Sequence, residues 1–483
     1  MADTTSRNDK WREELRGSLS AKERTAIPRA RMNELPADFR VTNNLEVNQG
    51  LSAEQALVES RRCLDCPDPQ CVTGCPVGIN IPGFIKNIER GEVLEAAAVL
   101  KQTSALPAVC GRVCPQERQC ESKCIYNKMK KEPVAIGYLE RFAADALQAA
   151  HDEVKTQKPE SNGIKIAVAG SGPAGLSFAG AMAKMGYEVT VFEALHEIGG
   201  VLKYGIPEFR LPNKVVDIEI EGLRELGVSF IPDIVIGKTI SYDQLIADGF
   251  KGIFVASGAG LPRFMDIPGE NLTGVMSSNE YLTRINLMGA GKSGYATPVL
   301  TGKNVAVIGG GNTAMDSVRT ARRMGAENAM IIYRRSEAEM PARAEEIHHA
   351  KQEGVKFMTL CNPVEYLPDE KGRVKTMRVQ RMELGEPDES GRRSPVPVEG
   401  AIEDIPVDVV IVSVGVSPNR LIPSSFDGLE VTRRGTILVN DNLQSSLPTI
   451  FAGGDIVRGG ATVILAMGDG RAAAKSMDEY LKK

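Results

Sequence analysis

The sequence predicts an α/β protein in which a helical, cysteine-rich N-terminal domain precedes two nested domains of the dinucleotide-binding type. Two observations support this fold class. Eight of the nine cysteines lie in two tight groups between residues 63 and 124. Downstream, a short apolar strand that leads into a glycine-rich turn and a helix occurs twice, beginning at residues 164 and 303.

The length and net charge of the chain limit the number of domains and the kinds of partner that we expect. A chain of 483 residues exceeds what one hydrophobic core usually serves, so we expect two or three domains. The formal net charge of -4 gives no general attraction for phosphate backbones, and we expect no nucleic-acid partner. Residues 1–40 are polar and charged, and no later stretch reaches about 18 uncharged apolar residues. We therefore expect a cytoplasmic protein without a membrane segment.

The cysteine spacing indicates metal binding. The two groups consist of Cys63, Cys66, Cys71 and Cys75, then Cys110, Cys114, Cys120 and Cys124. In a reducing compartment such groups usually bind metal or carry out redox chemistry instead of forming disulfides. Paired knuckles also occur in zinc sites, so the first group alone could hold zinc. A dense run that ends in Cys-Pro is more typical of iron-sulfur ferredoxins, which we favour although the middle gap is four residues instead of two.

The sequence around the cysteines is helical in pattern. Apolar residues at positions 81, 84, 85 and 88 follow the helical repeat after a candidate Asn80 cap, and a second apolar run covers residues 93–100. We therefore expect residues 1–150 to form a helical domain. The polar stretch 151–163 predicts a domain linker.

The first glycine-rich turn follows the apolar strand that begins at Ile164. It reads Gly170-x-Gly172-x-x-Gly175 and opens a helix rich in Ala, Leu and Met. Such glycines allow a tight turn and let a pyrophosphate approach the amides of the helix N-terminus. Glu193 ends the next strand, where an acidic side chain accepts hydrogen bonds from a ribose. The pattern predicts an FAD site, and the alternative is a structural turn without a ligand.

The second turn reads Gly309-x-Gly311-x-x-Ala314 and includes Asn312 and Thr313. At the position that corresponds to Glu193, this unit carries Arg334 and Arg335. Arginines there favour a 2'-phosphate over a free 2'-hydroxyl, which predicts NADPH as the ligand. The alternative is that both arginines form a solvated surface.

Further segments fit a protein with paired dinucleotide domains. Apolar strands at 252–259 and 409–419 suit the crossings between the domains. Near the C-terminus, Gly454 and Asp455 end a strand, and a helix begins near Ala461. We expect Asp455 to bind the ribityl chain of the flavin and the helix dipole to face its pyrimidine end. The predicted domains are 1–150 for the metal clusters, 164–280 with 416–483 for FAD, and 281–415 for NADPH.

Nearly the whole chain resembles the small (beta) subunit family of NADPH-dependent glutamate synthase. It is equally similar to the large subunit of NADH-dependent reduced ferredoxin:NADP oxidoreductase, and more distantly to the N-terminal half of dihydropyrimidine dehydrogenase. The stretches that carry the resemblance are CVTGCPVGINIPGFI, LPAVCGRVCPQERQCESKC, VAIGYLERF, YGIPEFRLP, GGGNTAMD and AGGDIVRGGATVILAMGDGRAAA. The resemblance implies a glutathione-reductase-like flavoprotein with Rossmann-like domains, and it adds Gly200 to the FAD site.

The resemblance also implies two 4Fe-4S clusters with interleaved ligands. The first ligand set would be Cys63, Cys66, Cys71 and Cys124, and the second would be Cys75, Cys114, Cys120 and Glu140. Relatives place Gln or Glu at the position of Glu140, and Cys110 is the competing fourth ligand. A carboxylate is a harder ligand than a thiolate and would change the cluster potential.

The function implied is electron transfer from NADPH through FAD and the clusters to a separate catalytic subunit, as in glutamate biosynthesis. We therefore expect a hetero-oligomer with a glutamate synthase large subunit or another redox partner. No residue receives an acid or base role, because hydride transfer requires none. The acceptor and the preference for NADPH over NADH stay open.

Two other classes remain. A thioredoxin-reductase-like flavoenzyme would relay electrons through a dithiol, but the two nucleotide domains contain only Cys361. A zinc-stabilised interaction module would carry no flavin and no iron. Iron and sulfide analysis separates this third class from the first two.

Overall fold

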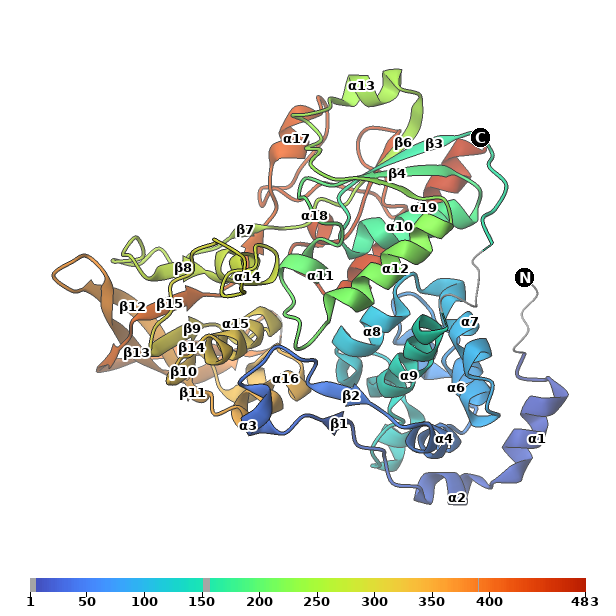
Figure 1. Cartoon of the computed structure of the whole chain (residues 1–483), viewed down its shortest axis with the longest axis horizontal. Helices are drawn as coiled ribbons and strands as arrows, with labels where there is room; N and C mark the ends of the chain where they lie inside the picture. The colour runs from blue at the N-terminus through green and yellow to red at the C-terminus, as the bar shows by residue number, and fades with distance from the viewer. Residues whose placement is uncertain (1–5, 151–156, 390) are drawn as a thin grey trace.

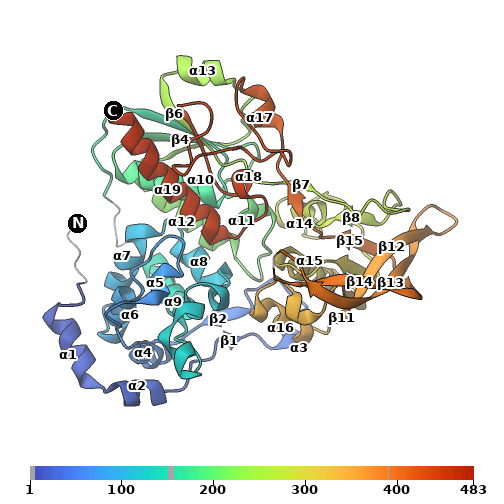
Figure 2. The ribbon, with the colours of Figure 1, turned by 180° about the vertical axis from the view of Figure 1, so that it is seen from behind.

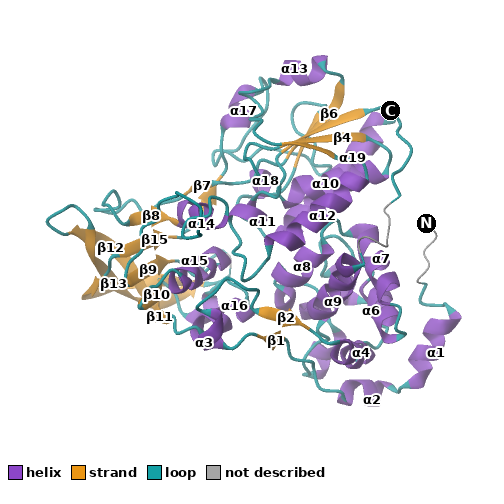
Figure 3. Cartoon of the chain, viewed as in Figure 1, coloured by secondary structure: helices purple, strands orange, loops and turns teal. Residues whose placement is uncertain are grey.

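The computed structural model describes residues 6–150, 157–389 and 391–483, which form a helical domain and two sheet-containing modules (Figure 1). The first part of the expected linker, residues 151–156, lies outside the described residues. Figure 3 shows how the helices gather in the N-terminal domain and the strands in the two modules. The predicted fold class is confirmed.

The helical domain contains short helices joined by turns, with one small strand pair. Its elements are α1 (Lys10–Ser18), α2 (Ala21–Ala26), β1 (Asn33–Glu34), α3 (Ala37–Arg40), β2 (Asn48–Gly50), α4 (Ala53–Arg61), α5 (Gln70–Thr73), α6 (Ile81–Glu89), α7 (Val93–Thr103), α8 (Pro107–Val113), α9 (Ile136–Ala149) and the 3-10 turns η1 (Gln116–Arg118), η2 (Glu121–Lys123) and η3 (Ile125–Met129). Asn80 Oδ1 accepts a hydrogen bond from Gly83 N (3.0 Å), which confirms the predicted cap of α6. Helix α6 is buried along its whole length, and Phe84 and Ile85 are each 1% exposed. Burial of such a side chain contributes about 1.5–3 kcal/mol.

The first module is built on a parallel sheet with the strand order β17-β6-β3-β4-β5. Its strands are β3 (Lys165–Ala169), β4 (Glu188–Phe192), β5 (Ser229–Ile231), β6 (Phe250–Val255) and β17 (Ile450–Ala452). Its helices are α10 (Pro173–Lys184), α11 (Val201–Tyr204), α12 (Asn213–Glu225), α13 (Tyr242–Ala247), α17 (Leu421–Ser425), α18 (Asp455–Arg458) and α19 (Val463–Leu481). The central strands β3 and β6 are apolar and mostly buried, as expected for a parallel sheet that is covered on both faces, whereas the edge strand β5 is largely exposed. The pairing of β17 with β6 shows that this module draws on two distant segments of the chain.

The second module contains a parallel sheet with the order β11-β10-β9-β15-β8 and an antiparallel sheet with the order β12-β13-β14. Its elements are β8 (Val275–Ser277), α14 (Ser278–Asn286), β9 (Asn304–Ile308), α15 (Asn312–Arg323), β10 (Asn328–Tyr333), η4 (Glu337–Glu339), α16 (Ala344–Gln352), β11 (Lys356–Thr359), β12 (Cys361–Pro368), β13 (Val374–Pro387), β14 (Arg393–Pro406) and β15 (Val409–Val412). The chain enters and leaves this module through an antiparallel pair, β7 (Leu261–Pro262) and β16 (Val416–Ser417). Strands β12 and β13 lie at the left of Figure 1, at the end of the module that points away from the helical domain.

The helical domain contacts both modules (Figure 2). Its core is continuous with that of the first module, because Leu100 and Val109 belong to the same buried apolar cluster as Phe178 and Met467. It reaches the second module through Arg40, which is 1% exposed and whose Nε lies 2.9 Å from Glu353 Oε1. No helix among the described residues is long and apolar enough to cross a membrane.

Candidate functional site

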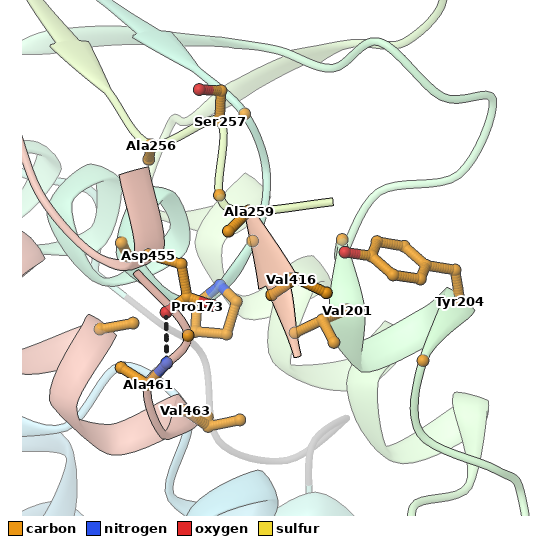
Figure 4. Close-up of a pocket in the computed structure, with 18 of the residues that line it drawn as sticks. Pro173, Val201, Tyr204, Ala256, Ser257, Ala259, Val416, Asp455, Ala461 and Val463 are labelled. Atoms are coloured by element: carbon orange, nitrogen blue, oxygen red, sulfur yellow. Dashed lines mark hydrogen bonds between the residues drawn. The ribbon is translucent and has the colours of Figure 1, made fainter. Parts of the chain in front are cut away.

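A cavity of about 460 Å³ lies between the two modules and is lined by the helices that follow both glycine-rich turns. Its lining residues come from the start of α10, the start of α15 and the segment around the start of α19. They are Gly172, Pro173, Ala174, Asn312, Thr313, Asp455, Ala461, Thr462 and Val463. Figure 4 shows Pro173, Asp455, Ala461 and Val463 on one side and Val201 and Tyr204 on the other. The cavity therefore joins segments far apart in the sequence.

The first turn has the geometry of a phosphate-binding turn. Gly170 has φ +108°, and a Cβ there would lie 2.6 Å from Ala256 O. A Cβ on Gly175 would lie 2.0 Å from Gly170 O, so this glycine allows α10 to approach the turn closely. Gly172 has open space where a Cβ would be, and no side chain caps the helix that begins beside it. The first amides of α10 are thus available to an anion that enters the cavity.

Glu193 organises the same turn. Its Oε2 accepts hydrogen bonds from Ser171 N (2.9 Å) and Ser171 Oγ (2.5 Å), and its Oε1 accepts one from Leu195 N (2.9 Å). The side chain is buried and lines the cavity. Oε1 keeps a further lone pair for a ribose hydroxyl, and binding of the ribose by Glu193 stays a prediction.

Asp455 faces the cavity from the C-terminal part of the first module. Its Oδ1 accepts a hydrogen bond from Ala461 N at 3.1 Å, and burial raises the pKa of this carboxyl to about 6 (Figure 4). Helix α19 starts two residues later, at Val463, and is capped by Thr462. The sequence did not single out Asp469, whose Oδ2 accepts a hydrogen bond from Gly454 N (2.9 Å) and fixes the turn that carries Asp455.

The second turn repeats the first. Gly309 has φ +137°, and a Cβ there would lie 2.3 Å from Ser413 O. Gly311 has open space around it, and Ala314 is fully buried beneath the turn. Asn312 Oδ1 accepts a hydrogen bond from Arg343 N (2.9 Å), and Thr313 lines the cavity. The turn therefore offers its amides to a second anion at the opposite wall of the cavity.

The structure separates the two arginines that follow β10. Arg334 is exposed, whereas Arg335 is buried. The Arg335 guanidinium donates to Arg393 O (2.8 Å) and lies 2.5 Å from Asp388 Oδ2, in the β13–β14 hairpin. Arg334 is therefore the arginine that can turn toward a phosphate without breaking existing contacts. Neither arginine lines the cavity, and their binding of NADPH stays a prediction.

Six further polar side chains line the cavity: Tyr204, Arg210, Ser257, Asn279, Asp316 and Asn419. Arg210 belongs to the loop between α11 and α12, and Asp316 to α15 of the second module. Tyr204 and Arg210 both lie in the KYGIPEFRLP segment, residues 203–212, which the sequence marks by its resemblance but to which it assigns no role. Asp316 ends the GGGNTAMD stretch but received no role from the sequence, and no local pattern marked Asn279.

The first ligand set comes together in space. Burial raises the pKa of the Cys71 thiol, and the neighbouring Cys63, Cys124 and Cys66 raise it further. Burial also raises the pKa of Cys63 to about 11. These mutual effects place the four sulfurs of Cys63, Cys66, Cys71 and Cys124 in one group, although Cys124 is distant in sequence.

The second ligand set also converges, and Glu140 lies within it. Burial raises the pKa of Cys75 to about 11, and Glu140 contributes to this rise and to those of Cys114 and Cys120. Glu140 is 5% exposed, and its Oε1 is buried without a hydrogen-bond partner in the structure. Burial, followed by the charge of Glu219, raises the Glu140 pKa to about 8. A buried carboxylate oxygen without a donor, among three thiols, fits a metal-cluster ligand.

A single metal ion has different requirements. Within the described residues, no three His, Cys, Asp or Glu side chains lie close enough to hold one ion. In a 4Fe-4S cluster each protein ligand binds a different iron. The finding therefore concerns mononuclear sites and does not test the cluster prediction.

Cys110 lies beside the second ligand set and contacts helix α19. Its side chain is 1% exposed, and its Sγ lies 3.5 Å from Met467 Sδ in α19. The pKa of Cys114 is raised well above the ordinary thiol value, first by Cys110 and then by burial. Cys110 therefore contacts one candidate ligand and the helix that begins at the cavity.

Two dinucleotide-type turns that share one cavity, beside a domain with converging cysteines, define an oxidoreductase of the pyridine-nucleotide class with an iron-sulfur domain. The comparisons with known proteins agree. Residues 164–470 match the family described as pyridine nucleotide-disulphide oxidoreductase, and residues 40–152 match that described as dihydropyrimidine dehydrogenase domain II, 4Fe-4S cluster. This chain belongs to the family of the small chains of NADPH glutamate synthase, as the following relatives show.

The chain is 37% identical to the glutamate synthase [NADPH] small chain of Azospirillum brasilense, over 92% of this chain and 93% of that protein. It is 36% identical to the Escherichia coli small chain, over 92% and 96%. It is also 41% identical to the NADP(+)-dependent formate dehydrogenase subunit beta of Moorella thermoacetica, but spans only 60% of that protein's length. Mycobacterium tuberculosis FprA in complex with NADPH matches 66% of this chain and 85% of its own, with a TM-score of 0.56 and 19% identity, which shows a shared fold.

Proposed function

We propose that this protein is an NADPH-oxidising electron-transfer subunit that passes electrons through FAD and two 4Fe-4S clusters to a partner. One observation carries the proposal: the helix that begins at the cavity, α19, contacts Cys110 through Met467, and Cys110 adjoins the second ligand set. The cavity and the candidate cluster ligands are thus connected by direct packing. Short separations between redox centres are what electron transfer requires.

The residues of the first module fit FAD. The open space at Gly172 and the uncapped start of α10 suit the pyrophosphate, and Glu193 suits the adenosine ribose. Gly200 and Asp455 also line the cavity, Gly200 beside Gly172 of the first turn and Asp455 beside the residue that precedes α19 by two positions, Ala461. When bound, FAD accepts two electrons from NADPH and releases them singly to iron-sulfur clusters. The chain itself orients the two nucleotides, lines part of the cavity with apolar side chains such as Val201 and Val463, and points the positive end of the α19 dipole toward the cavity.

The residues of the second module fit NADPH. Asn312 and Thr313 bring the start of α15 to the cavity, and Gly311 leaves room for a pyrophosphate. Arg334 is the candidate for the 2'-phosphate. Asn279 and Tyr204 would then border the nicotinamide, because they line the cavity between the two turns.

The partner that best fits is a glutamate synthase large subunit, because two small chains of that enzyme match this protein over nearly their whole length. A second candidate is another redox subunit. The matches to a formate dehydrogenase subunit and to an NADPH-Fe(3+) oxidoreductase subunit of Geobacter sulfurreducens support it. Both assignments use the same residues of this chain and predict a hetero-oligomer.

The test is anaerobic purification with the native partners, followed by absorption spectra before and after stoichiometric NADPH. We expect one FAD, about eight iron and about eight labile sulfide per chain, and bleaching on reduction. About four iron would reduce the proposal to one cluster. Bound zinc without flavin would overturn it and favour a structural cysteine domain. The subunit that co-purifies identifies the acceptor.

A further inference from the structure

A short basic segment, residues 122–131, runs from η2 through η3 toward α9 on the surface of the helical domain. It contains Lys123, Lys128, Lys130 and Lys131 and no acidic residue, although the whole chain carries a net charge of -4. All four lysines are exposed. The segment therefore departs in sign from the rest of the protein.

The charges of this segment are not neutralised by the chain. Lys131 Nζ donates to Thr25 O (2.6 Å), and the other three lysines form no ion pair or side-chain hydrogen bond within the described part of the chain. The acids at either end are already paired: Glu121 lies 2.8 Å from Arg29, and Glu132 lies 3.0 Å from Arg31. Three unpaired cations thus remain available on one short stretch.

The basic segment surrounds a member of the first ligand set. Cys124 lies within it, is partly exposed, and adjoins Cys66 and Cys71. A Cβ on Gly74 would lie 3.0 Å from Lys123 Cγ, so Lys123 covers the loop that follows Cys71. Lys123 therefore lies beside the first cluster's predicted position, and the other three lysines follow within seven residues of Cys124 in the chain.

The segment is held in place and offers an apolar contact. Tyr126 is fully buried, and its hydroxyl contacts Arg62 O at 2.6 Å and Arg24 O at 3.1 Å. Met129, beside it, is 41% exposed. Exposed methionine within a polar rim is typical of protein interfaces. A basic segment that is held by a buried tyrosine and carries an exposed apolar side chain suits a protein partner better than a small ligand.

We propose that the basic segment is the exit surface for electrons, where an acidic face of the electron-accepting protein docks over the first cluster. This inference rests on the proposed function. NADPH is oxidised to NADP+ and a proton and supplies two electrons, so two one-electron acceptors are reduced for each NADPH. Opposite charges steer such an encounter and raise its rate, and salt weakens it.

The first test measures binding of an acidic probe protein, oxidised plant-type ferredoxin, to the full holoprotein. In the test variant Lys123, Lys128 and Lys130 are replaced by Glu. In the control variant three exposed lysines elsewhere, Lys238, Lys251 and Lys375, are replaced in the same way. We expect the Kd to rise at least tenfold in the test variant and with added salt, and to stay near wild type in the control. Equal effects of both variants would overturn the proposal.

The second test follows re-oxidation of NADPH-reduced protein by two small acceptors. Ferricyanide is an anion and hexaammineruthenium(III) is a cation. We expect the test variant to slow cluster re-oxidation by ferricyanide about tenfold and to accelerate that by hexaammineruthenium(III). The test variant must contain full iron, and NADPH must reduce its FAD at the normal rate. If its cluster re-oxidation rates are then unchanged, the exit surface is overturned and the proposed function is not. Missing iron or FAD in the wild type would instead overturn the proposed function. Binding of anionic vesicles that survives loss of ferredoxin binding would point to a membrane surface and would also overturn it.

Discussion

Arg210 and Asp316 form a buried ion pair that joins the two modules at the wall of the cavity. Arg210 Nη1 lies 2.7 Å from Asp316 Oδ2, and the two side chains are 5% and 3% exposed. Despite this pairing, the pKa of Asp316 is raised to about 7, because burial outweighs the attraction of Arg210 and the nearby Glu346 repels the charge. The pair therefore makes the contact between the modules sensitive to pH.

The first prediction concerns this pH dependence. The folded protein holds the Asp316 proton up to about pH 7, whereas the unfolded chain releases it near pH 4. The stabilisation from the protonated form is complete below about pH 4 and is lost as the pH rises through about 7. Asp316→Asn should remove roughly 2–4 kcal/mol of this change in the unfolding free energy. Urea unfolding at pH 5 and pH 8 measures this change in the unfolding free energy. Asp427→Asn, at an exposed position, is the control. The prediction is contradicted if the unfolding free energies of the two variants change equally between these pH values.

The second prediction concerns Glu353, which binds three arginines. Its carboxylate lies 2.8 Å from Arg319 and from Arg323 and 2.9 Å from Arg40. Burial opposes its ionisation, but the arginines prevail and lower its pKa to about 2. Its stabilisation is present above about pH 4.5 and is lost as the pH falls toward 2.

Glu353→Gln should therefore destabilise the protein by about 3–5 kcal/mol at pH 7, because it leaves buried guanidinium groups without their anion. The measurement is urea unfolding followed by circular dichroism at pH 7 and at pH 3, where the difference from wild type should shrink. Glu327→Gln is the matched control, since Glu327 pairs with Lys303 on the surface. A cost as small as that of the control would show that the arginines repack without Glu353.

The Arg40 contact also shows what the sequence could predict. Both glycine-rich turns, their strands and the cap at Asn80 follow from local patterns, because spacing and the special conformations of glycine are properties of neighbouring residues. Arg40 and Glu353 are 313 positions apart, and no periodicity links them. The pairing of Arg335 with Asp388 is likewise a tertiary contact, and it separates two adjacent arginines that the sequence could only treat alike. Convergence of Glu140 with the cysteines could be expected only through resemblance to a family.

The third prediction separates binding from folding at the first turn. A Cβ on Gly172 meets no atom within 4 Å, whereas a Cβ on Gly175 would lie 2.0 Å from Gly170 O. Gly172→Ala should thus fold normally but lose FAD, because its methyl group occupies the space of the pyrophosphate. Gly175→Ala should lower the thermal midpoint even without flavin. FAD content, iron content and apoprotein melting measure the difference; full FAD in folded Gly172→Ala would contradict the assignment of this turn.

The fourth prediction concerns the fourth ligand of the second set. Glu140 Oε1 is buried without a partner, whereas Cys110 already contacts Met467. Glu140→Ala should therefore lose about four iron per chain, while Cys110→Ala should keep all of them and shift only the potential of the second cluster. Iron counts and EPR spectra of the reduced proteins test this. Loss of the second cluster's signal in Cys110→Ala, with Glu140→Ala unaffected, would make Cys110 the ligand.

The fifth prediction concerns the choice of nicotinamide nucleotide. Arg334 is exposed, whereas Arg335 is bound to Asp388 and to Arg393 O in the β13–β14 hairpin. If Arg334 pairs with the 2'-phosphate, Arg334→Ala should raise the KM for NADPH about tenfold and leave that for NADH unchanged, since NADH has no such phosphate. Arg335→Ala should instead lower the thermal midpoint, because it removes the buried guanidinium together with its ion pair to Asp388 and its hydrogen bond to Arg393 O. Equal losses with both nucleotides in Arg334→Ala would place the 2'-phosphate elsewhere, and steady-state kinetics with NADPH and NADH decide between the two arginines.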